Sequence, residues 1–374
     1  GGDVAVHGHL SDAAFLRAIV EFEGALADAA ETAGVIDADA AAAARAAVAG
    51  FELDSDTLTA IAVASAAGGN PAIPLATALK RRAGDHPEGV HVGATSQDAI
   101  DTALVLCTRR ALDELDRDLA DVRDLLTGLA RNHRDTPVMG RTLGQQALPT
   151  TFGAVAAGWL EGVEQAWDAL DVAAAALPVQ YAGATGNLVA THPAGVRIHD
   201  LLAERLNLAA TPLVWHTNRQ PIVAVGVAAA RVAGAVRKIA GDVVAYSATE
   251  IGELSEATPG GSSSMPHKTN PAAAVACDGY ARRTPGLAAT LLDALDCRWQ
   301  RGVGSWHAEW QTLRDLLAAT ASAVSRIRTS LDGIRVNAGA MAHNIALTGH
   351  DPRNLNTGHA GDIVDAALNP QEGH

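Results

Sequence analysis

The sequence predicts an all-α protein that forms an elongated bundle of long helices, and its composition and residue spacing carry this prediction. Alanine, the residue with the highest helix propensity, is abundant, whereas aromatic residues make up only 3% of the 374 residues. Apolar residues recur at alternating steps of three and four over long segments, which places them on one face of a helix. Small side chains let helices approach closely, whereas a β-sandwich would need β-branched and aromatic residues.

The first part of the chain is expected to fold into shorter helices. Residues 12–34 have the spacing of an amphipathic helix, and the glycine at its end favours termination there. A turn is expected at residues 68–71, and another helix is expected to begin within residues 74–79. We expect these elements to form a small helical N-terminal domain over residues 1–97.

The central part, residues 98–337, is expected to contain the long helices. Heptad-like apolar stripes cover residues 112–129, 222–246 and 313–331, and two alanine-rich segments cover residues 153–176 and 272–295. Five long helices in one region predict an extended bundle. Because stripes this long and this rich in Val and Ala commonly pack against other subunits, we also expect a homo-oligomer. Residues 338–374 are too few to form an independent domain.

Net charge and cysteine usage exclude several classes of function. The formal net charge of −14 argues against nonspecific nucleic-acid binding, which needs a basic surface. The three cysteines, Cys107, Cys277 and Cys297, are isolated and have no metal-site spacing, so we expect no metal and a reducing, cytoplasmic setting. No apolar run reaches the length that spans a bilayer, and the N-terminus lacks the pattern of a signal peptide.

The segment 260–271 concentrates groups that suit chemistry on an anionic substrate. Two glycines open it, a proline closes it, and Ser, His, Lys and Asn side chains lie between them. Its composition alone is equally compatible with a plain surface loop. Its position between two long apolar-periodic segments favours a mobile loop that covers an active site.

Two other segments could bind carboxylates. Thr95 and Ser96 precede the first long helix, where free backbone N–H groups and hydroxyls could hold an anion, although ordinary N-capping explains the same pattern. Arg141, in the segment 140–150, could clamp a carboxylate with two hydrogen bonds. The alternative for Arg141 is a turn in which it pairs with one of the many acids.

Two segments contain tryptophan beside polar residues. The segment 215–220 contains His216, Asn218 and Arg219, and it also has the pattern of a helix start before a proline. The segment 301–310 begins with Arg301, which could support a site, and its two tryptophans share one helical face, as packing residues do.

These segments resemble the fumarase/aspartase superfamily. The segment 261–271 matches its signature G-S-S-x-M-P-x-K-x-N-P at every specified position. The segments 93–102 and 141–149 resemble the G-A-T-S-Q-D-x-x-D-T and R-T-L-x-Q-Q-A-L-P forms of the 3-carboxy-cis,cis-muconate cycloisomerase family. Leu143 stands where adenylosuccinate and argininosuccinate lyases have a proton-transferring His. Asn218 and Gln220 depart from the W-H-T-Q-R-D form of the cycloisomerases, which puts substrate affinity in question.

The resemblance implies a fumarase/aspartase-like fold and an intramolecular cycloisomerase that forms a lactone from 3-carboxy-cis,cis-muconate in protocatechuate catabolism. It implies homotetramers with shared active sites, a polycarboxylate substrate and no cofactor. It also implies that most of the C-terminal domain is missing and that residues 338–374 are its remnant. The alternatives are a fumarate-releasing lyase such as adenylosuccinate lyase and a relative that is non-catalytic or has another substrate.

The resemblance also assigns site residues. The implied catalytic residues are Ser262 as the base, Lys268, and His91 as an acid or substrate contact. The implied substrate-binding residues are Thr95, Ser96, Gln97, Arg141, Gln145, His216, Asn218, Arg219, Ser263, Met265, Asn270 and Arg301.

Overall fold

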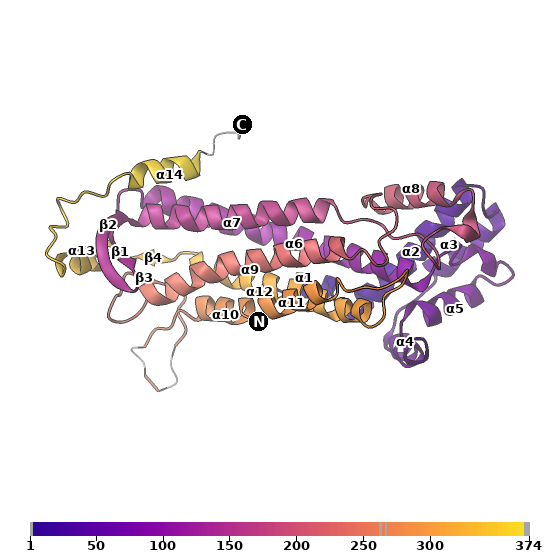
Figure 1. Cartoon of the computed structure of the whole chain (residues 1–374). Coiled ribbons are helices and arrows are strands. Elements are labelled where there is room, and N and C mark those ends of the chain that lie inside the picture. The colour runs from indigo at the N-terminus through magenta and orange to yellow at the C-terminus, as the bar shows by residue number, and fades with distance from the viewer. Residues whose placement is uncertain (1–2, 262–263, 266–267, 370–374) are drawn as a thin grey trace.

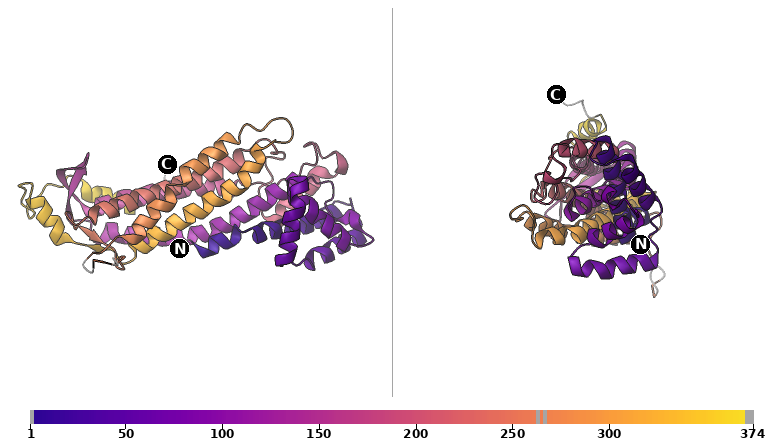
Figure 2. Two further views of the ribbon diagram at one scale, coloured as in Figure 1. Left: turned by 90° about the horizontal axis from the view of Figure 1, so that it is seen from below. Right: turned by 90° about the vertical axis from the view of Figure 1, so that its right-hand side faces the viewer.

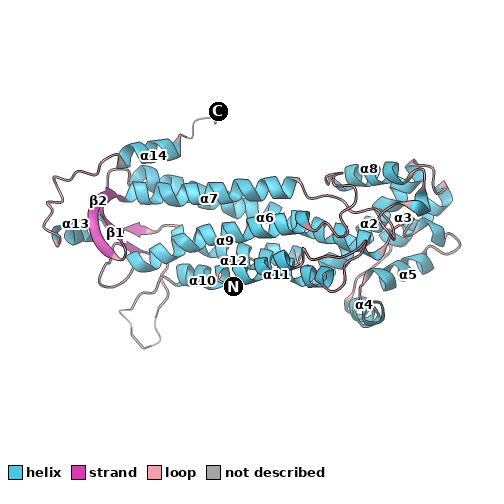
Figure 3. Cartoon of the chain, viewed as in Figure 1, coloured by secondary structure: helices cyan, strands magenta, loops and turns pink. Residues whose placement is uncertain are grey.

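The computed structural model describes residues 3–261, 264–265 and 268–369, and most of them are helical (Figure 3). The N-terminal helices are α1 (Val4–His9), α2 (Asp12–Thr32), α3 (Ala38–Ala49), α4 (Ser55–Gly68), α5 (Ala72–Arg82) and the short 3-10 turn η1 (Pro87–Gly89). The long helices are α6 (Ser96–Asn132), α7 (Phe152–Ala175), α9 (Gln220–Tyr246) and α12 (Ser305–Leu331). The other elements are β1 (Pro137–Thr142), β2 (Gln145–Thr151), η2 (Val189–Thr191), α8 (Gly195–Leu206), β3 (Leu254–Ser255), α10 (Ala272–Ala281), α11 (Thr284–Asp293), β4 (Arg335–Val336), α13 (Ala338–Ala346) and α14 (Ala360–Leu368).

The long helices lie side by side and give the molecule an elongated shape, as Figures 1 and 2 show. Helix α6 contacts α7 and α12, and α9 contacts α7, α10 and α12. The apolar stripes predicted from the sequence form the core, since Leu115, Leu119 and Val122 of α6 are buried together with Val232 and Val236 of α9. The prediction of an all-α long-helix bundle is therefore correct.

The two ends of the bundle differ in structure (Figure 1). At one end α2, α3, α4, α5 and α8 form a group of shorter helices around the start of α6. At the other end the β1–β2 hairpin, the β3–β4 pair and α13 cap the bundle. Helix α14 packs on α7, and Arg134 holds it by hydrogen bonds of 2.8 and 2.6 Å to the carboxylate of Asp365. No helix in the described part of the chain is both long and apolar enough to cross a membrane.

Two local predictions need correction. The alanine-rich segment 272–295 forms α10 and α11 instead of one helix, because Pro285 lies in the first turn of α11 and cannot continue a preceding helix. The segment 140–150, for which no strands were predicted, belongs to an antiparallel hairpin over residues 137–151 whose tip is Leu143 and Gly144. Both tip residues have positive φ, 52° and 79°, as a two-residue hairpin loop that follows the strand twist requires.

Candidate active site

The structure places the predicted site residues at the two ends of one long helix. His91, Thr95 and Arg301 belong to the end where α6 begins, and Arg141 and Lys268 belong to the end where it finishes (Figure 1). Helix α6 has 37 residues, which corresponds to a length of about 55 Å at 1.5 Å per residue. One chain alone therefore does not bring the two groups of residues together.

At the first end, the start of α6 carries a cationic group beside its free backbone N–H groups. Thr95 is the N-cap, as the capping alternative predicted, and its N–H donates to the Asp98 carboxylate at 2.9 Å. Arg301 donates a hydrogen bond from Nη1 to the Thr95 hydroxyl, and Ser96 is the first helical residue. A helix N-terminus, two hydroxyls and a guanidinium in one place suit a carboxylate.

Asp98 joins three separate segments at this end. Its carboxylate accepts hydrogen bonds from Nε2 of His216 at 2.7 Å and from the backbone N–H groups of Ala182 and Gly183 at 3.1 and 3.0 Å. Asp98 and His216 are both buried. The predicted substrate contact of His216 thus coincides with a structural contact that holds the loop before α9 against α6.

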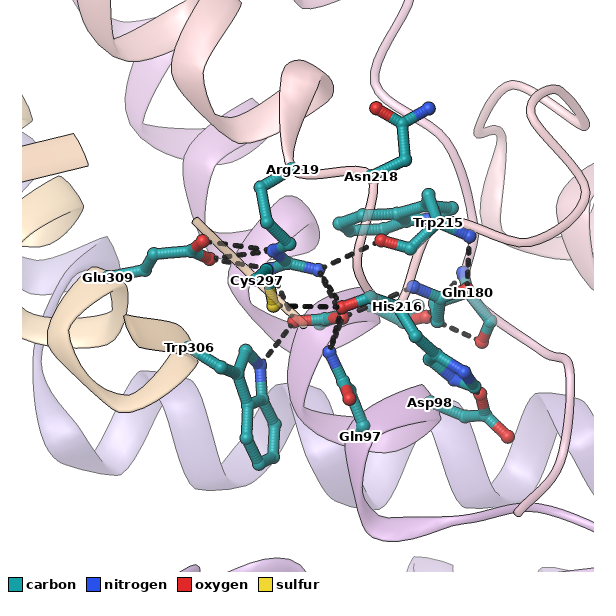
Figure 4. A network of polar contacts seen from close by, with 12 residues as sticks. Gln97, Asp98, Gln180, Trp215, His216, Asn218, Arg219, Cys297, Trp306 and Glu309 are labelled. Atoms are coloured by element: carbon teal, nitrogen blue, oxygen red, sulfur yellow. Dashed lines mark hydrogen bonds and ion pairs between the residues drawn. The ribbon is translucent and has the colours of Figure 1, made fainter. Parts of the chain in front are cut away.

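Arg219 lies at the centre of a buried ionic network (Figure 4). Nε and Nη2 donate to the Glu309 carboxylate at 2.9 and 2.6 Å, and Nη1 and Nη2 donate to Asp101 at 2.8 and 2.9 Å. None of the three side chains is exposed to solvent, and the Trp306 indole donates to Asp101 at 2.9 Å. Burial lowers the pKa of Arg219, but Asp101 and Glu309 outweigh that effect and raise it. In this arrangement every guanidinium nitrogen of Arg219 has an internal partner.

Two neighbours of this network differ in accessibility. Gln97 is fully buried, and its Nε2 donates to Asp101 at 3.1 Å and to the His216 carbonyl at 2.8 Å. Asn218 is exposed, and Figure 4 shows its amide pointing away from Arg219. Of these two predicted substrate contacts, Asn218 is the one whose side chain is open to solvent.

The second end contains Arg141 on the β1–β2 hairpin. Its guanidinium forms a two-pronged contact with the Glu253 carboxylate, with both distances 2.8 Å, and lies 5.4 Å from the centre of the Tyr246 ring. Glu253 is fully buried and also accepts a hydrogen bond of 2.7 Å from Asn344. The alternative in which Arg141 pairs with an acid is therefore correct, and the hydrogen bonds of Glu253 raise the pKa of Arg141. Arg141 also lines a cavity of about 580 Å³ with Tyr246.

The tip of the hairpin projects from the bundle. The Leu143 side chain is fully exposed, and Gln145, the first residue of β2, is also exposed. The predicted substrate contact of Gln145 thus lies on a part of the molecule that faces outward.

The glycine-rich loop closes on itself at its base. Gly260 and Asn270 exchange two backbone hydrogen bonds of 2.8 Å, and the Asn270 amide donates to the Gly261 carbonyl at 3.2 Å. Met265 and Lys268 are exposed on the loop, and the Lys268 N–H donates to the Met265 carbonyl at 3.0 Å. The predicted base Ser262 and the predicted substrate contact Ser263 lie outside the described residues.

Several acidic residues of the site received no role from the sequence. Asp98 and Asp101 occur three residues apart and directly precede the long apolar part of the helix, and this pattern could have indicated buried carboxylates. Glu309 shares a helical face with Trp306, which gives a similar signal. Glu23 lies four residues after Ile19 and three before Leu26, on the apolar face of its helix, which gives the same signal. Glu253 lies in a segment without such a pattern. Groups of His, Cys, Asp and Glu that could hold a metal ion are absent from the described residues.

Comparison with known proteins decides the family. A family described as lyase matches residues 6–286 of the chain. The chain belongs to this lyase family. The 3-carboxy-cis,cis-muconate cycloisomerase of Pseudomonas aeruginosa is 40% identical over 346 residues, which cover 90% of this chain and 75% of that relative. The nitrosuccinate lyase of Streptomyces davaonensis is 41% identical over 359 residues, which cover 92% of this chain and 75% of that protein.

A solved structure of this lyase family confirms the predicted fold. The 3-carboxy-cis,cis-muconate lactonizing enzyme from Pseudomonas putida superimposes with a TM-score of 0.88 at 36% identity. The superposition covers 98% of this chain and 85% of that structure. The resemblance to the fumarase/aspartase superfamily and to its cycloisomerases, inferred from the motifs, is therefore confirmed.

Proposed function

We propose that this protein is a cycloisomerase that forms 4-carboxymuconolactone from 3-carboxy-cis,cis-muconate. The observation that carries the proposal is Leu143, which stands at the hairpin tip where the fumarate-releasing lyases of the resemblance have a proton-transferring His. The relatives named as 3-carboxy-cis,cis-muconate cycloisomerases, 40% identical over most of the chain, support the same activity. We place the activity in protocatechuate catabolism.

The reaction requires groups that hold several carboxylates and exchange one proton. A substrate carboxylate attacks a conjugated double bond, the C–O bond of the lactone forms, and a proton is added to the adjacent carbon. The nucleophile belongs to the substrate, so the enzyme mainly has to stabilise the negative charge that develops on the neighbouring carboxylate. Thr95, Ser96 and Arg301 would bind one carboxylate, Lys268 and Asn270 another, and Ser262 would exchange the proton.

We propose a homotetramer in which different subunits contribute the two ends of the site. The length of α6 supports this arrangement, because it separates the Thr95 group from the Lys268 group within one chain. The exposed Leu143 and Gln145 would then reach the start of α6 in a neighbouring subunit. Arg141 would position the hairpin through Glu253, and Arg219 would position the His216–Asn218 loop. The three free cysteines fit a reducing, cytoplasmic location.

A second candidate is an elimination from a substituted succinate. The nitrosuccinate lyase relative favours it, because this protein is 41% identical to the chain, about as similar as the relatives named as cycloisomerases. Both reactions place a carbanion beside a carboxylate, so the same residues could serve either one. The exposed Asn218, which is one methylene shorter than the cycloisomerase glutamine, is a position where the two specificities could differ.

One set of assays separates the two candidates. Purified protein is mixed with 3-carboxy-cis,cis-muconate while the diene absorbance is followed, and separately with nitrosuccinate or adenylosuccinate while fumarate is followed. We expect loss of diene absorbance, its abolition by Ser262→Ala, and no effect of Ser55→Ala on the exposed start of α4. Turnover of nitrosuccinate without turnover of the muconate would establish the second candidate. Full activity of Ser262→Ala would reject Ser262 as the base.

The shared site is tested by complementation. Ser262→Ala and Arg301→Ala change the two different halves of the proposed site, so each variant alone is expected to be nearly inactive. The subunits of the two variants are then dissociated, mixed and reassembled. In a mixed tetramer, some sites receive an unchanged residue 262 from one subunit and an unchanged residue 301 from another, and these sites are expected to regain activity. Absence of recovery in assemblies shown to be mixed would argue against sites between subunits.

A further inference from the structure

Glu23 and His91 form a close pair that none of the sequence motifs includes. Glu23 lies on α2, and its side chain is only 1% exposed. One carboxylate oxygen lies 2.6 Å from Nδ1 of His91, and the other accepts a hydrogen bond of 2.8 Å from the His91 backbone N–H. Both oxygens of this buried acid are therefore directed at one residue, 68 positions later in the chain.

The backbone at His91 is held in an unusual conformation. His91 has φ 61°, which is uncommon for a residue with a Cβ and costs energy that the surroundings must supply. The hydrogen bond from its N–H to Glu23 fixes this conformation. Two residues later Gly93 has φ 62°, and its Cα lies against Thr191, since a Cβ there would come within 2.5 Å of the threonine Cγ2. The loop that leads to Thr95 thus has a defined shape.

The contact with Glu23 determines which nitrogen of the ring carries a proton. A carboxylate accepts hydrogen bonds, so Nδ1 of His91 must be the donor. None of the described residues hydrogen-bonds Nε2, and the side chain is 17% exposed. Nε2 is therefore the ring nitrogen that is available to bind a ligand. His91 precedes Thr95 by four residues in the chain.

The charges around His91 favour its protonated form. Burial, the largest effect, lowers the pKa of His91, but the charge and hydrogen bond of Glu23 raise it above its ordinary value. Asp98 adds to the increase and Lys80 opposes it. A protonated ring has an N–H at Nε2 as well as at Nδ1.

We propose that Glu23 is a positioning residue that orients His91 so that Nε2–H binds a carboxylate of the substrate. The inference rests on the proposed function and adds a cation to the Thr95–Arg301 carboxylate site. It makes no use of the glycine-rich loop. It requires a substrate with an anionic group at this end of α6, which both candidate reactions supply.

The experiment compares Glu23→Gln with the matched control Glu21→Gln. Glu21 lies on the same helix but pairs with Arg110 at the surface. The pKa of His91 is measured by NMR titration, with His91→Gln assigning the signal. We expect Glu23→Gln to lower this pKa by about one unit or more, as removal of an adjacent opposite charge does. We expect Glu21→Gln to leave it unchanged, and Glu23→Asp serves as a second variant if the glutamine does not fold.

Carboxylate binding is measured by calorimetry with an unreactive probe, propane-1,2,3-tricarboxylate. Near pH 7.5 we expect Glu23→Gln to weaken binding about tenfold, the effect of losing one charged hydrogen bond, while Glu21→Gln binds like the unchanged protein. An unchanged His91 pKa, unchanged binding, or no binding by the unchanged protein would each overturn the inference. These measurements do not depend on turnover, so failure of the muconate assay alone would reject only the proposed function.

Discussion

His216 donates a hydrogen bond from Nε2 to Oδ1 of Asp98 at 2.7 Å, although 118 positions separate the two residues in the chain. The same carboxylate accepts the N–H groups of Ala182 and Gly183. A single buried acid thereby fixes the relative positions of the α6 start and of two loops. This arrangement explains how residues from distant motifs come to surround one end of the bundle.

Asp98→Asn should therefore lower the stability of the fold. The amide keeps the shape of the side chain but loses its charge and presents an NH2 group to neighbouring donors. We expect a loss of about 2–4 kcal/mol in the free energy of unfolding. Urea denaturation followed by circular dichroism at fixed protein concentration measures it. Asp113→Asn, at an exposed position on the same helix, should change stability by less than about 0.5 kcal/mol. Equal effects of the two substitutions would show that the Asp98 contacts contribute little.

Arg219→Met should destabilise the protein in a pH-dependent way. It leaves the carboxylates of Asp101 and Glu309 buried without their cation, at a cost of about 3–5 kcal/mol near pH 7.5. In the unchanged protein, burial raises the pKa of Glu309 even though Arg219 opposes this. A carboxyl group whose pKa is higher in the folded state takes up a proton on folding, so its contribution to stability falls as pH rises.

Because Arg219→Met raises the Glu309 pKa further, the deficit of this variant should shrink as pH falls toward about 5. The measurement is the difference in unfolding free energy between variant and unchanged protein at several pH values. Arg237→Met removes a half-exposed arginine that pairs with Asp278 and serves as the control. A deficit that is the same at every pH would contradict a charge-based origin.

The sequence predicts the helices well because their signal is local. The apolar periods of α6, α9 and α12 lie within single segments, so the long bundle could be inferred before any contact was known. The β1–β2 hairpin was missed because its strands are short and only half-buried, and its turn is Leu–Gly instead of the usual Asn–Gly.

The site was predicted less completely, for a physical reason. The motifs named Arg141 and Arg219, but their partners Glu253 and Glu309 are single acids on other elements. Which acid pairs with which arginine depends on how helices pack, and no local pattern contains that information. The sequence therefore predicted groups that could bind a substrate, and the structure adds the buried residues that position them.

Asp118→Asn should increase stability above neutral pH. Burial raises the pKa of Asp118 to about 6, with Asp3 and Asp121 adding to the effect and Arg328 opposing it. Since the pKa is raised in the folded state, the ionised carboxylate increasingly destabilises the folded state as pH rises from about 4 through about 6. We expect a gain of about 1 kcal/mol at pH 8 and little change at pH 4.5, after allowing for the lost pair with Arg328. Thermal unfolding at the two pH values measures it, and a loss of stability at both would contradict the prediction.

Arg141→Lys should reduce activity more than stability. Lysine cannot make the two parallel hydrogen bonds to Glu253, so the hairpin would lose its orientation. If the proposed function is correct, we expect kcat/KM for 3-carboxy-cis,cis-muconate to fall by at least about tenfold. Arg134→Lys is the matched control, because Arg134 makes a similar two-pronged contact with Asp365 and has no role in the proposed site. An equal fall in kcat/KM in the two variants would show that the Arg141 contact has no special role in activity.

Gly93→Ala and Gly128→Ala should change stability in opposite directions. At position 93 the added Cβ would lie 2.5 Å from Cγ2 of Thr191 and 2.9 Å from the Tyr181 hydroxyl, in a backbone with φ 62°. These are contacts that real Cβ atoms do not make, so the loop that carries His91 must shift, and we expect a loss of about 2–4 kcal/mol. At position 128, inside α6, nothing lies within 4 Å of the added Cβ, and alanine should stabilise the helix by about 0.5–1 kcal/mol. Parallel urea titrations measure both values, and a Gly93→Ala variant as stable as Gly128→Ala would show that the loop before Thr95 tolerates another shape.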